Sequence, residues 1–237
     1  MMSKFWHYGD SYSMNDFLLE NLENNYRAET QIGNFGNIIS NQLDKEYKFK
    51  GVTGFSNELI FNRILYNLNQ FEKGDIIFIN WSYFTRGSYV DKYGVIHSTN
   101  NWFDETMPGM TDEGKDKLEK LENYSFIMDY ILSYNYDFNT KLFYGYVAPC
   151  FKNLIEKGIV IYNLFINYNE ELTFGKSLKK FVMPNVMGNN IRFDGGYMNW
   201  LIQGELHGDE EGHYTADNQQ YIAEEILKRM DGKSKLI

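Results

Sequence analysis

Short apolar runs that alternate with helical patterns constrain the fold of this chain more than any other feature. The clearest runs are GDIIFINWS at 74–82 and IVIYNLF at 159–165, whose central residues are mostly apolar. Runs of this kind are typical of strands in a parallel sheet that is covered on both faces. Two shorter candidate strands are KFWHY at 4–8 and KFKGVTG at 48–54. Because helical patterns separate these segments, the sequence predicts an α/β fold with a parallel sheet between helices.

Apolar residues recur at helical spacing in the segments between and after these strands. Ser56 is a candidate N-cap, and Glu58 in the following turn suits the positive end of a helix dipole. Thr111 and Thr215 are candidate caps for two later helices. No internal repeat or low-complexity linker is visible, so we expect one domain over 1–237. The predicted helices cover 34–47, 56–71, 111–134, 141–158 and 215–230.

The composition argues against several classes of partner. The net charge of −9 disfavours binding to nucleic acid, which usually needs a basic face, and docking on an anionic membrane. No apolar run is long enough to span a bilayer, and the first residues lack the pattern of a signal peptide. We therefore expect synthesis in the cytoplasm, with any later release by lysis or as part of a virion. The single cysteine, Cys150, lies in a largely apolar segment, which indicates a small buried residue rather than a nucleophile.

Candidate reactive residues follow the predicted strands. Ser11 and Gly54 each lie where a strand is expected to end, and reactive groups of parallel sheets gather at the carboxyl ends of the strands. A serine hydroxyl becomes a nucleophile when a neighbouring base takes its proton. His213 is the candidate base, although a histidine in an acidic loop is, taken alone, more often a solvated surface residue. Asp209 or Glu210 is close enough in sequence to orient the His213 ring, as the third member of a triad does.

Three segments resemble the SGNH/GDSL hydrolases. GDSYS at 9–13 resembles the first block of that family, GVTGFSNELI at 51–60 the second, and DEEGHYTADNQQYIAEEIL at 209–227 the last. The blocks occur in the order of the family and span nearly the whole chain. The resemblance implies that Ser11 is the nucleophile and that its N–H and that of Gly54 receive the oxyanion. It also implies a flavodoxin-like, three-layer α/β/α sandwich with a mostly parallel five-stranded sheet, and no cofactor.

The last block departs from the family pattern in its acid. The family's acid is usually an aspartate three residues before the histidine. In this chain Glu210 occupies that place, and Asp209 lies one residue earlier. Asp209 has the usual residue type and Glu210 the usual spacing, so both remain candidates for the acid.

The third block departs further. The family shows Gly-x-Asn after the third strand, whereas alignment from Asp75 places Ser82 at the glycine and Phe84 at the asparagine. The asparagine that donates to the oxyanion is therefore missing, or Asn80 supplies it from a shifted register. Ser82 or Arg86 could also supply the missing hydrogen bond, and a surface ion pair is the alternative role for Arg86. Loss of one such donor commonly costs about 10²–10³-fold in rate.

The polar segment 87–112 is too long for a simple connector and predicts a functional insert or lid. It is rich in Gly, Asn and Asp and carries large aromatic residues, which could stack on sugar rings or pack in the core. The candidate substrate-binding residues are Arg86, Tyr89, Tyr93 and Trp102.

A second cluster contains potential metal ligands near the C-terminal end of the chain. It lacks the spacing of a recognised metal site, and no upstream segment clearly completes it, so we expect no metal. Its members are His207, Asp209, Glu211 and His213.

Two functions fit these features. The first is a serine esterase that removes O-acetyl groups from a carbohydrate, with a small-molecule or polysaccharide ester as substrate. The second is a catalytically weak or inactive SGNH-fold binding or structural module, for example in a phage particle, as part of an oligomer or a larger assembly. The altered third block motivates the second interpretation.

Overall fold

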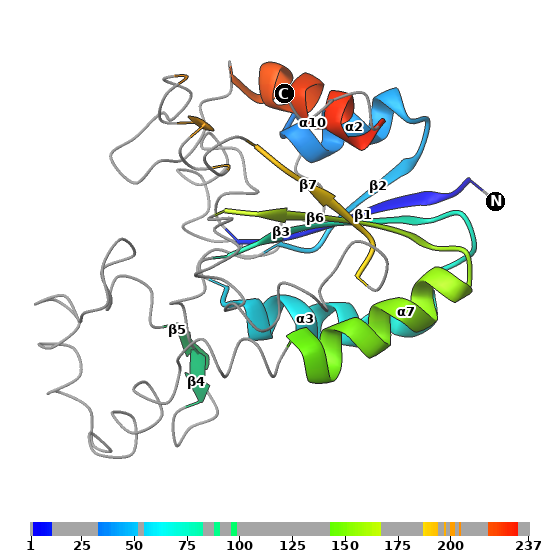
Figure 1. The fold of residues 1–237 in the computed structure, drawn as a ribbon, viewed down its shortest axis with the longest axis vertical. Helices are drawn as coiled ribbons and strands as arrows, with labels where there is room; N and C mark the ends of the chain where they lie inside the picture. Colours follow the sequence, from blue (N-terminus) through cyan, green and yellow to red (C-terminus); the bar gives the residue numbers. More distant parts are fainter. Residues whose placement is uncertain are drawn as a thin grey trace, which may run out of the picture.

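The central feature of the molecule is a sheet of five parallel strands in the order β2-β1-β3-β6-β7. The computed structural model describes residues 2–10, 33–51, 55–82, 88–90, 96–98, 143–166, 187–193, 197, 200–201, 204 and 218–231. The strands are β1 (Lys4–Tyr8), β2 (Glu46–Phe49), β3 (Ile76–Trp81), β6 (Val160–Phe165) and β7 (Asn189–Ile191). Figure 1 shows this sheet between two helical layers, which confirms the predicted three-layer α/β/α sandwich.

Helices cover both faces of the sheet. On one face lie α2 (Phe35–Gln42) and α10 (Gln219–Met230), and on the other lie α3 (Asn57–Tyr66) and α7 (Ala148–Glu156) (Figure 1). Short helical turns, η3 (Leu68–Gln70) and η4 (Phe143–Val147), follow α3 and precede α7. A separate antiparallel pair, β4 (Ser88–Val90) and β5 (Ile96–Ser98), lies within the predicted insert.

Residues of the central strands alternate between two hydrophobic cores. In β1, Trp6 and Tyr8 pack in the core beneath α3 and α7, whereas Phe5 packs in the core beneath α2 and α10. All six residues of β3 are buried, as expected for a central strand that is covered on both faces. The chain leaves β1 for β2 on one side and then crosses to β3 on the other side. The strand order therefore reverses between β1 and β3, and such a switch point is where open α/β sheets bind ligands.

His7 of β1 is buried among aromatic rings at the centre of the α2 side. Tyr47 Oη lies 2.9 Å from His7 Nδ1 and donates its hydrogen to Asn34 Oδ1 at 2.8 Å. Because the Tyr47 hydrogen is used in that bond, His7 Nδ1 carries a hydrogen and donates it to Tyr47. His7 Nε2 has no hydrogen-bond partner among the described residues. Burial lowers the pKa of His7 to about 3, so the folded protein holds this ring neutral at physiological pH.

Gly36, the second residue of α2, lies directly against the His7 ring. A Cβ atom at this position would lie 2.1 Å from His7 Nδ1, which no real side chain tolerates. Glycine destabilises a helix interior by roughly 0.5–1 kcal/mol relative to alanine, but here it allows α2 to approach β1 closely. The close approach explains why a helix with good apolar spacing contains a glycine.

A buried carboxyl group ties the amino ends of β1 and β3 together. Asp75, which is 1% exposed, accepts hydrogen bonds from the backbone N–H of Lys4 at 2.8 Å and from Trp6 Nε1 at 2.9 Å. It also accepts the backbone N–H of Glu72 at 3.1 Å, which closes the turn before β3. The Asp75 carboxyl group therefore holds β1 against β3 at the amino ends of the two strands.

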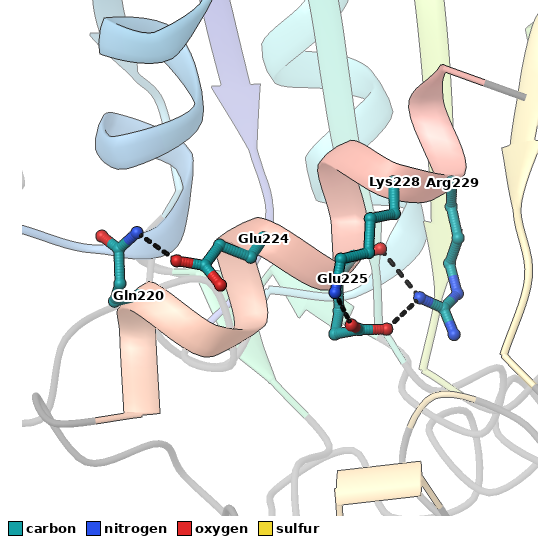
Figure 2. A network of polar contacts seen from close by, with 5 residues as sticks. All are labelled: Gln220, Glu224, Glu225, Lys228 and Arg229. Carbon is teal, nitrogen blue, oxygen red and sulfur yellow. Dashed lines mark hydrogen bonds and ion pairs between the residues drawn. The ribbon is translucent and has the colours of Figure 1, made fainter. Parts of the chain in front are cut away.

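Polar side chains on α10 connect successive turns of the helix (Figure 2). Gln220 donates to Glu224 at 2.8 Å, and Glu225 pairs with both Lys228 and Arg229 at 2.6 Å. The hydrogen bonds from Lys228 and Arg229 lower the pKa of Glu225. Arg229 also donates to the backbone oxygen of residue 192 at 2.9 Å, so α10 is linked to the segment that follows β7.

Several predicted boundaries differ from the structure. The second strand spans Glu46–Phe49 rather than 48–54, because the preceding helix ends at Gln42 and the chain turns at once into the sheet. Asp44 makes that turn with a φ of 52°, which is left-handed. The helix expected over 56–71 ends at Tyr66 and continues as the short turn η3.

The C-terminal part of the sequence also folds differently from the prediction. The last helix begins at Gln219, so Thr215 is not its N-cap; Asn218 holds that position and makes no side-chain capping bond. Strand β7 was not predicted. The predicted helix at 111–134 and most of the insert at 87–112 lie outside the described residues.

Candidate active site

A buried hydrogen bond joins the segments that directly follow β1 and β3. Asp10 lies two residues beyond β1, and Ser82 lies one residue beyond β3; they are 0% and 1% exposed. The Ser82 hydroxyl donates to Asp10 Oδ2 at 2.7 Å. The bond therefore spans the switch point of the sheet, at the carboxyl ends of the two strands. Ser11, the predicted nucleophile, is the next residue after Asp10 and lies outside the described residues.

A second buried hydrogen bond joins the end of β3 to the start of α3. Asn57, the first residue of α3, is buried and donates from Nδ2 to the backbone oxygen of Ser82 at 3.1 Å. Ser56 caps the same helix by accepting the N–H of Leu59, as the sequence predicted. The segment that carries Gly54 leads into this helix, although Gly54 itself lies outside the described residues. Segments from the first three sequence blocks thus meet at the carboxyl ends of the strands.

Asn80 is the next-to-last residue of β3 and is fully buried. Within the described part of the chain, neither its amide nitrogen nor its amide oxygen has a hydrogen-bond partner. Since strand residues alternate between faces, Asn80 shares the face of Phe78, which α2 and α10 cover. An unpaired buried amide typically costs about 1–3 kcal/mol per group. Asn80 therefore offers an amide donor and acceptor close to the carboxyl end of the central strand β3.

The remaining predicted site residues are only partly described. Tyr89 lies in β4 opposite His97, and its side chain is not described. The catalytic, oxyanion-hole and substrate-binding candidates outside the described residues are Ser11, Gly54, Arg86, Tyr93, Trp102, Asp209, Glu210 and His213. Of the predicted site residues, Ser82 lies at the carboxyl end of β3, in contact with Asp10 and Asn57. Asp10 and Asn57 were not predicted as site residues. Asp10 belongs to the GDSYS segment and Asn57 to the GVTGFSNELI segment, but no role was predicted for either residue.

Other reactive groups in the described part of the chain do not form a second site. Cys150 is half-buried in α7, and burial raises the pKa of its thiol, which favours the unreactive protonated form. Among the described residues, no group of three or more His, Cys, Asp or Glu side chains could hold a metal ion. The potential ligands His207, Asp209, Glu211 and His213 lie outside them. None of the helices described here has the length and apolar character needed to cross a membrane.

No family model and no curated protein sequence matches the chain. Among solved structures, it is similar to protein YxiM from Bacillus subtilis, at 10% sequence identity and a TM-score of 0.51. That match covers 100% of this chain and 58% of YxiM, so the chain spans little more than half the length of that protein.

Two further solved structures align over almost the whole of both chains. The lipase/acylhydrolase from Enterococcus faecalis has 9% identity and a TM-score of 0.48, with 99% of this chain and 98% of that chain covered. Phospholipase A1 from Streptomyces albidoflavus has 10% identity and a TM-score of 0.48, with coverage of 97% and 100%.

The sheet order and the helices on both faces give the chain the three-layer α/β/α fold that its resemblance to the SGNH/GDSL hydrolases implied. At about 10% identity, likeness to solved structures concerns the fold, and the chemistry has to be argued from the residues themselves.

Proposed function

We propose that this chain is a serine ester hydrolase of the SGNH type, with Ser11 as the nucleophile. The observation that carries the proposal is the place of Asp10. It is buried at the switch point of a parallel sheet and hydrogen-bonded to the end of β3. Ser11 is the next residue in the sequence, and its proposed place is therefore at the carboxyl ends of the strands, where such sheets hold their reactive groups.

The proposed mechanism has two steps that use the same residues. Ser11 Oγ attacks the ester carbonyl while His213 takes its proton; the C–O bond to the alcohol then breaks, and His213 protonates the departing oxygen. A water molecule, deprotonated by His213, next attacks the acyl-enzyme; the bond between the acyl carbon and Ser11 Oγ breaks, and His213 returns the proton to Ser11 Oγ as the acid leaves. The backbone N–H groups of Ser11 and Gly54 are the proposed donors to the oxyanion.

Asn80 is the proposed side-chain donor that replaces the missing third-block asparagine. Its amide hydrogens are not used by any other described group, whereas the single hydroxyl hydrogen of Ser82 is donated to Asp10. This difference favours Asn80 over Ser82 as a donor to the oxyanion. Arg86, the other candidate, retains its proposed role in substrate binding.

A fluorophosphonate probe tests the proposal directly, because it reacts with activated serine hydroxyls. We expect the probe to label the wild-type protein at Ser11, as located by peptide mass spectrometry, and to leave Ser11→Ala unlabelled. Ser13→Ala is a matched control from the same GDSYS segment and is expected to label like the wild type. Labelling at another serine, or none in the wild type, would contradict the assignment.

The identity of the acid is a separate prediction. If Asp209 orients His213, Asp209→Asn is expected to reduce turnover of p-nitrophenyl acetate at least about tenfold more than Glu210→Gln, because only the first would disturb the imidazole tautomer. The reverse order would assign the role to Glu210. Small and equal losses would mean that neither carboxylate holds the ring.

We further propose O-acetylated carbohydrate as the substrate class. The segment that leaves β3 at the site edge forms the β4–β5 pair, and aromatic residues of the insert, such as Tyr93 and Trp102, offer flat faces for sugar rings. We expect acetate release from acetylated xylan to exceed hydrolysis of a long-chain p-nitrophenyl ester. A preference for the long-chain ester, or full polysaccharide activity after Tyr93→Ala and Trp102→Ala, would rule out this substrate class.

A binding or structural module that has lost strong catalysis is the second candidate. It is favoured by the third block, where Ser82 replaces a glycine and its hydroxyl is used in a bond to Asp10. Absence of both probe labelling and ester turnover in the folded wild type would support this candidate.

A further inference from the structure

We propose that Ser82 is a positioning residue for the nucleophile, and this inference rests on the proposed esterase function. Different atoms of Ser82 make contacts in the interior: its hydroxyl donates to Asp10, and its backbone oxygen accepts from Asn57. These contacts link the chain just before Ser11 to the helix just after Gly54. One residue therefore connects Asp10, which precedes the proposed nucleophile in sequence, with Asn57, which lies three residues after the proposed oxyanion donor.

The contact to Asp10 is strong because of where it lies. Asp10 is fully buried, and a buried carboxyl group needs hydrogen-bond donors to offset the loss of hydration. The 2.7 Å distance is typical of a strong O–H···O bond. A glycine at position 82, which the SGNH resemblance would place there, has no side chain to reach Asp10. The serine thus supplies a contact that the altered third block of this chain makes possible.

The contact to Asn57 extends this connection to the second block. Asn57 is fully buried at the first position of α3, and the Ser56 cap holds the start of that helix. Loss of the Ser82 hydroxyl would leave this second contact in place but remove the hydrogen bond between Asp10 and the residue that follows β3. The expected consequence is a shift of Ser11 relative to the oxyanion donors. Misplacement by about 1 Å can cost roughly 10²-fold in rate.

The test compares Ser82→Ala with Ser82→Thr, which keeps the hydroxyl. The readouts are the rate constant for fluorophosphonate labelling of Ser11 and the steady-state kinetics with p-nitrophenyl acetate. Ser82→Ala is expected to lower kcat and the labelling rate by roughly 10–100-fold with little change in KM, because the contact acts on geometry rather than on substrate binding. Ser82→Thr is expected to restore most of both rates.

Ser40→Ala is the matched control for the loss of a buried hydroxyl. Ser40 is fully buried on α2 and donates to the backbone oxygen of Asn37 at 2.8 Å, within the helix itself. The Ser40→Ala variant is expected to retain the wild-type labelling rate. Near-UV circular dichroism and urea unfolding show whether each variant is folded.

The outcomes separate this inference from the function beneath it. Wild-type rates in Ser82→Ala, or equal losses in Ser82→Ala and Ser40→Ala, would overturn the positioning role while labelling of the wild type still supports the esterase. No labelling of the wild type would overturn the esterase proposal and the positioning role together. A lower labelling rate in Ser82→Ala, a restored rate in Ser82→Thr and an unchanged rate in Ser40→Ala would support both the esterase function and the positioning role.

Discussion

Lowering the pH from about 7 to about 4 is expected to destabilise the wild-type protein by about 3 kcal/mol more than variants that lack His7. The cause is the buried imidazole, whose pKa is about 3 in the folded protein, whereas an exposed histidine has a pKa of 6.5. Between these values the unfolded chain binds a proton that the folded chain excludes. Stability from this group is therefore fully present above pH 6.5 and is lost as the pH falls towards 3.

Two substitutions isolate this effect from other changes. His7→Asn removes the titration but keeps an N–H near the Nδ1 position, where it can still donate to Tyr47. His7→Phe removes both the titration and that donor, and places an apolar ring among Phe35, Phe49 and Phe78, whose ring centroids lie 5.0–5.3 Å from that of His7.

The measurement is urea unfolding of the three proteins over a series of pH values. The two variants are expected to differ from each other in stability at pH 7 and yet to share a shallower dependence on pH. The prediction is wrong if all three curves of stability against pH run parallel.

The Asp75→Ala substitution is expected to lower the free energy of unfolding by about 3–5 kcal/mol, which is the second large effect. It removes the acceptor for the backbone N–H of Lys4, the indole N–H of Trp6 and the backbone N–H of Glu72. The Trp6 indole lies in the interior, where water cannot easily replace the lost carboxyl group. Asp75→Asn keeps one acceptor oxygen and is expected to fall between the wild type and Asp75→Ala.

Glu72→Ala serves as the control for Asp75, since it removes a nearby carboxylate at the surface. The Glu72 side chain is 52% exposed and lies 3.9 Å from Lys4 Nζ, and pairs of this kind contribute about 0–1 kcal/mol. Chemical unfolding monitored by tryptophan fluorescence measures both changes. A loss below 1 kcal/mol in Asp75→Ala would show that the three donors find other partners.

The predicted strands that agree best with the structure are those whose sequence indicates that both faces are buried. The runs at 74–82 and 159–165 contain β3 and β6, and 4–8 is β1, because continuous apolar residues have few alternatives to the centre of a sheet. β7, with the sequence Asn-Asn-Ile, carries no such signal. Its strand conformation comes from pairing with β6, a contact between residues far apart in the chain.

In the described part of the candidate site, the sequence predicted one position and missed the contacts around it. The strand predicted over 74–82 placed Ser82 at the carboxyl end of a central strand, and in the structure β3 ends one residue earlier, at Trp81. The sequence could not show that the Ser82 hydroxyl points at Asp10, since the two residues are 72 positions apart and meet only through the strand order. Likewise, the unpaired amide of Asn80 is a property of its surroundings, and no local pattern reports it.

The close approach of Gly36 to His7 has a consequence for how this sequence can change over time. A side chain at position 36 is excluded only while the imidazole occupies the space above it. Replacement of His7 by a much smaller residue would open that space, and alanine at position 36 would then favour the helix. Substitutions at the two positions should therefore occur in pairs among descendants of this chain, 29 residues apart in sequence and in direct contact in the fold.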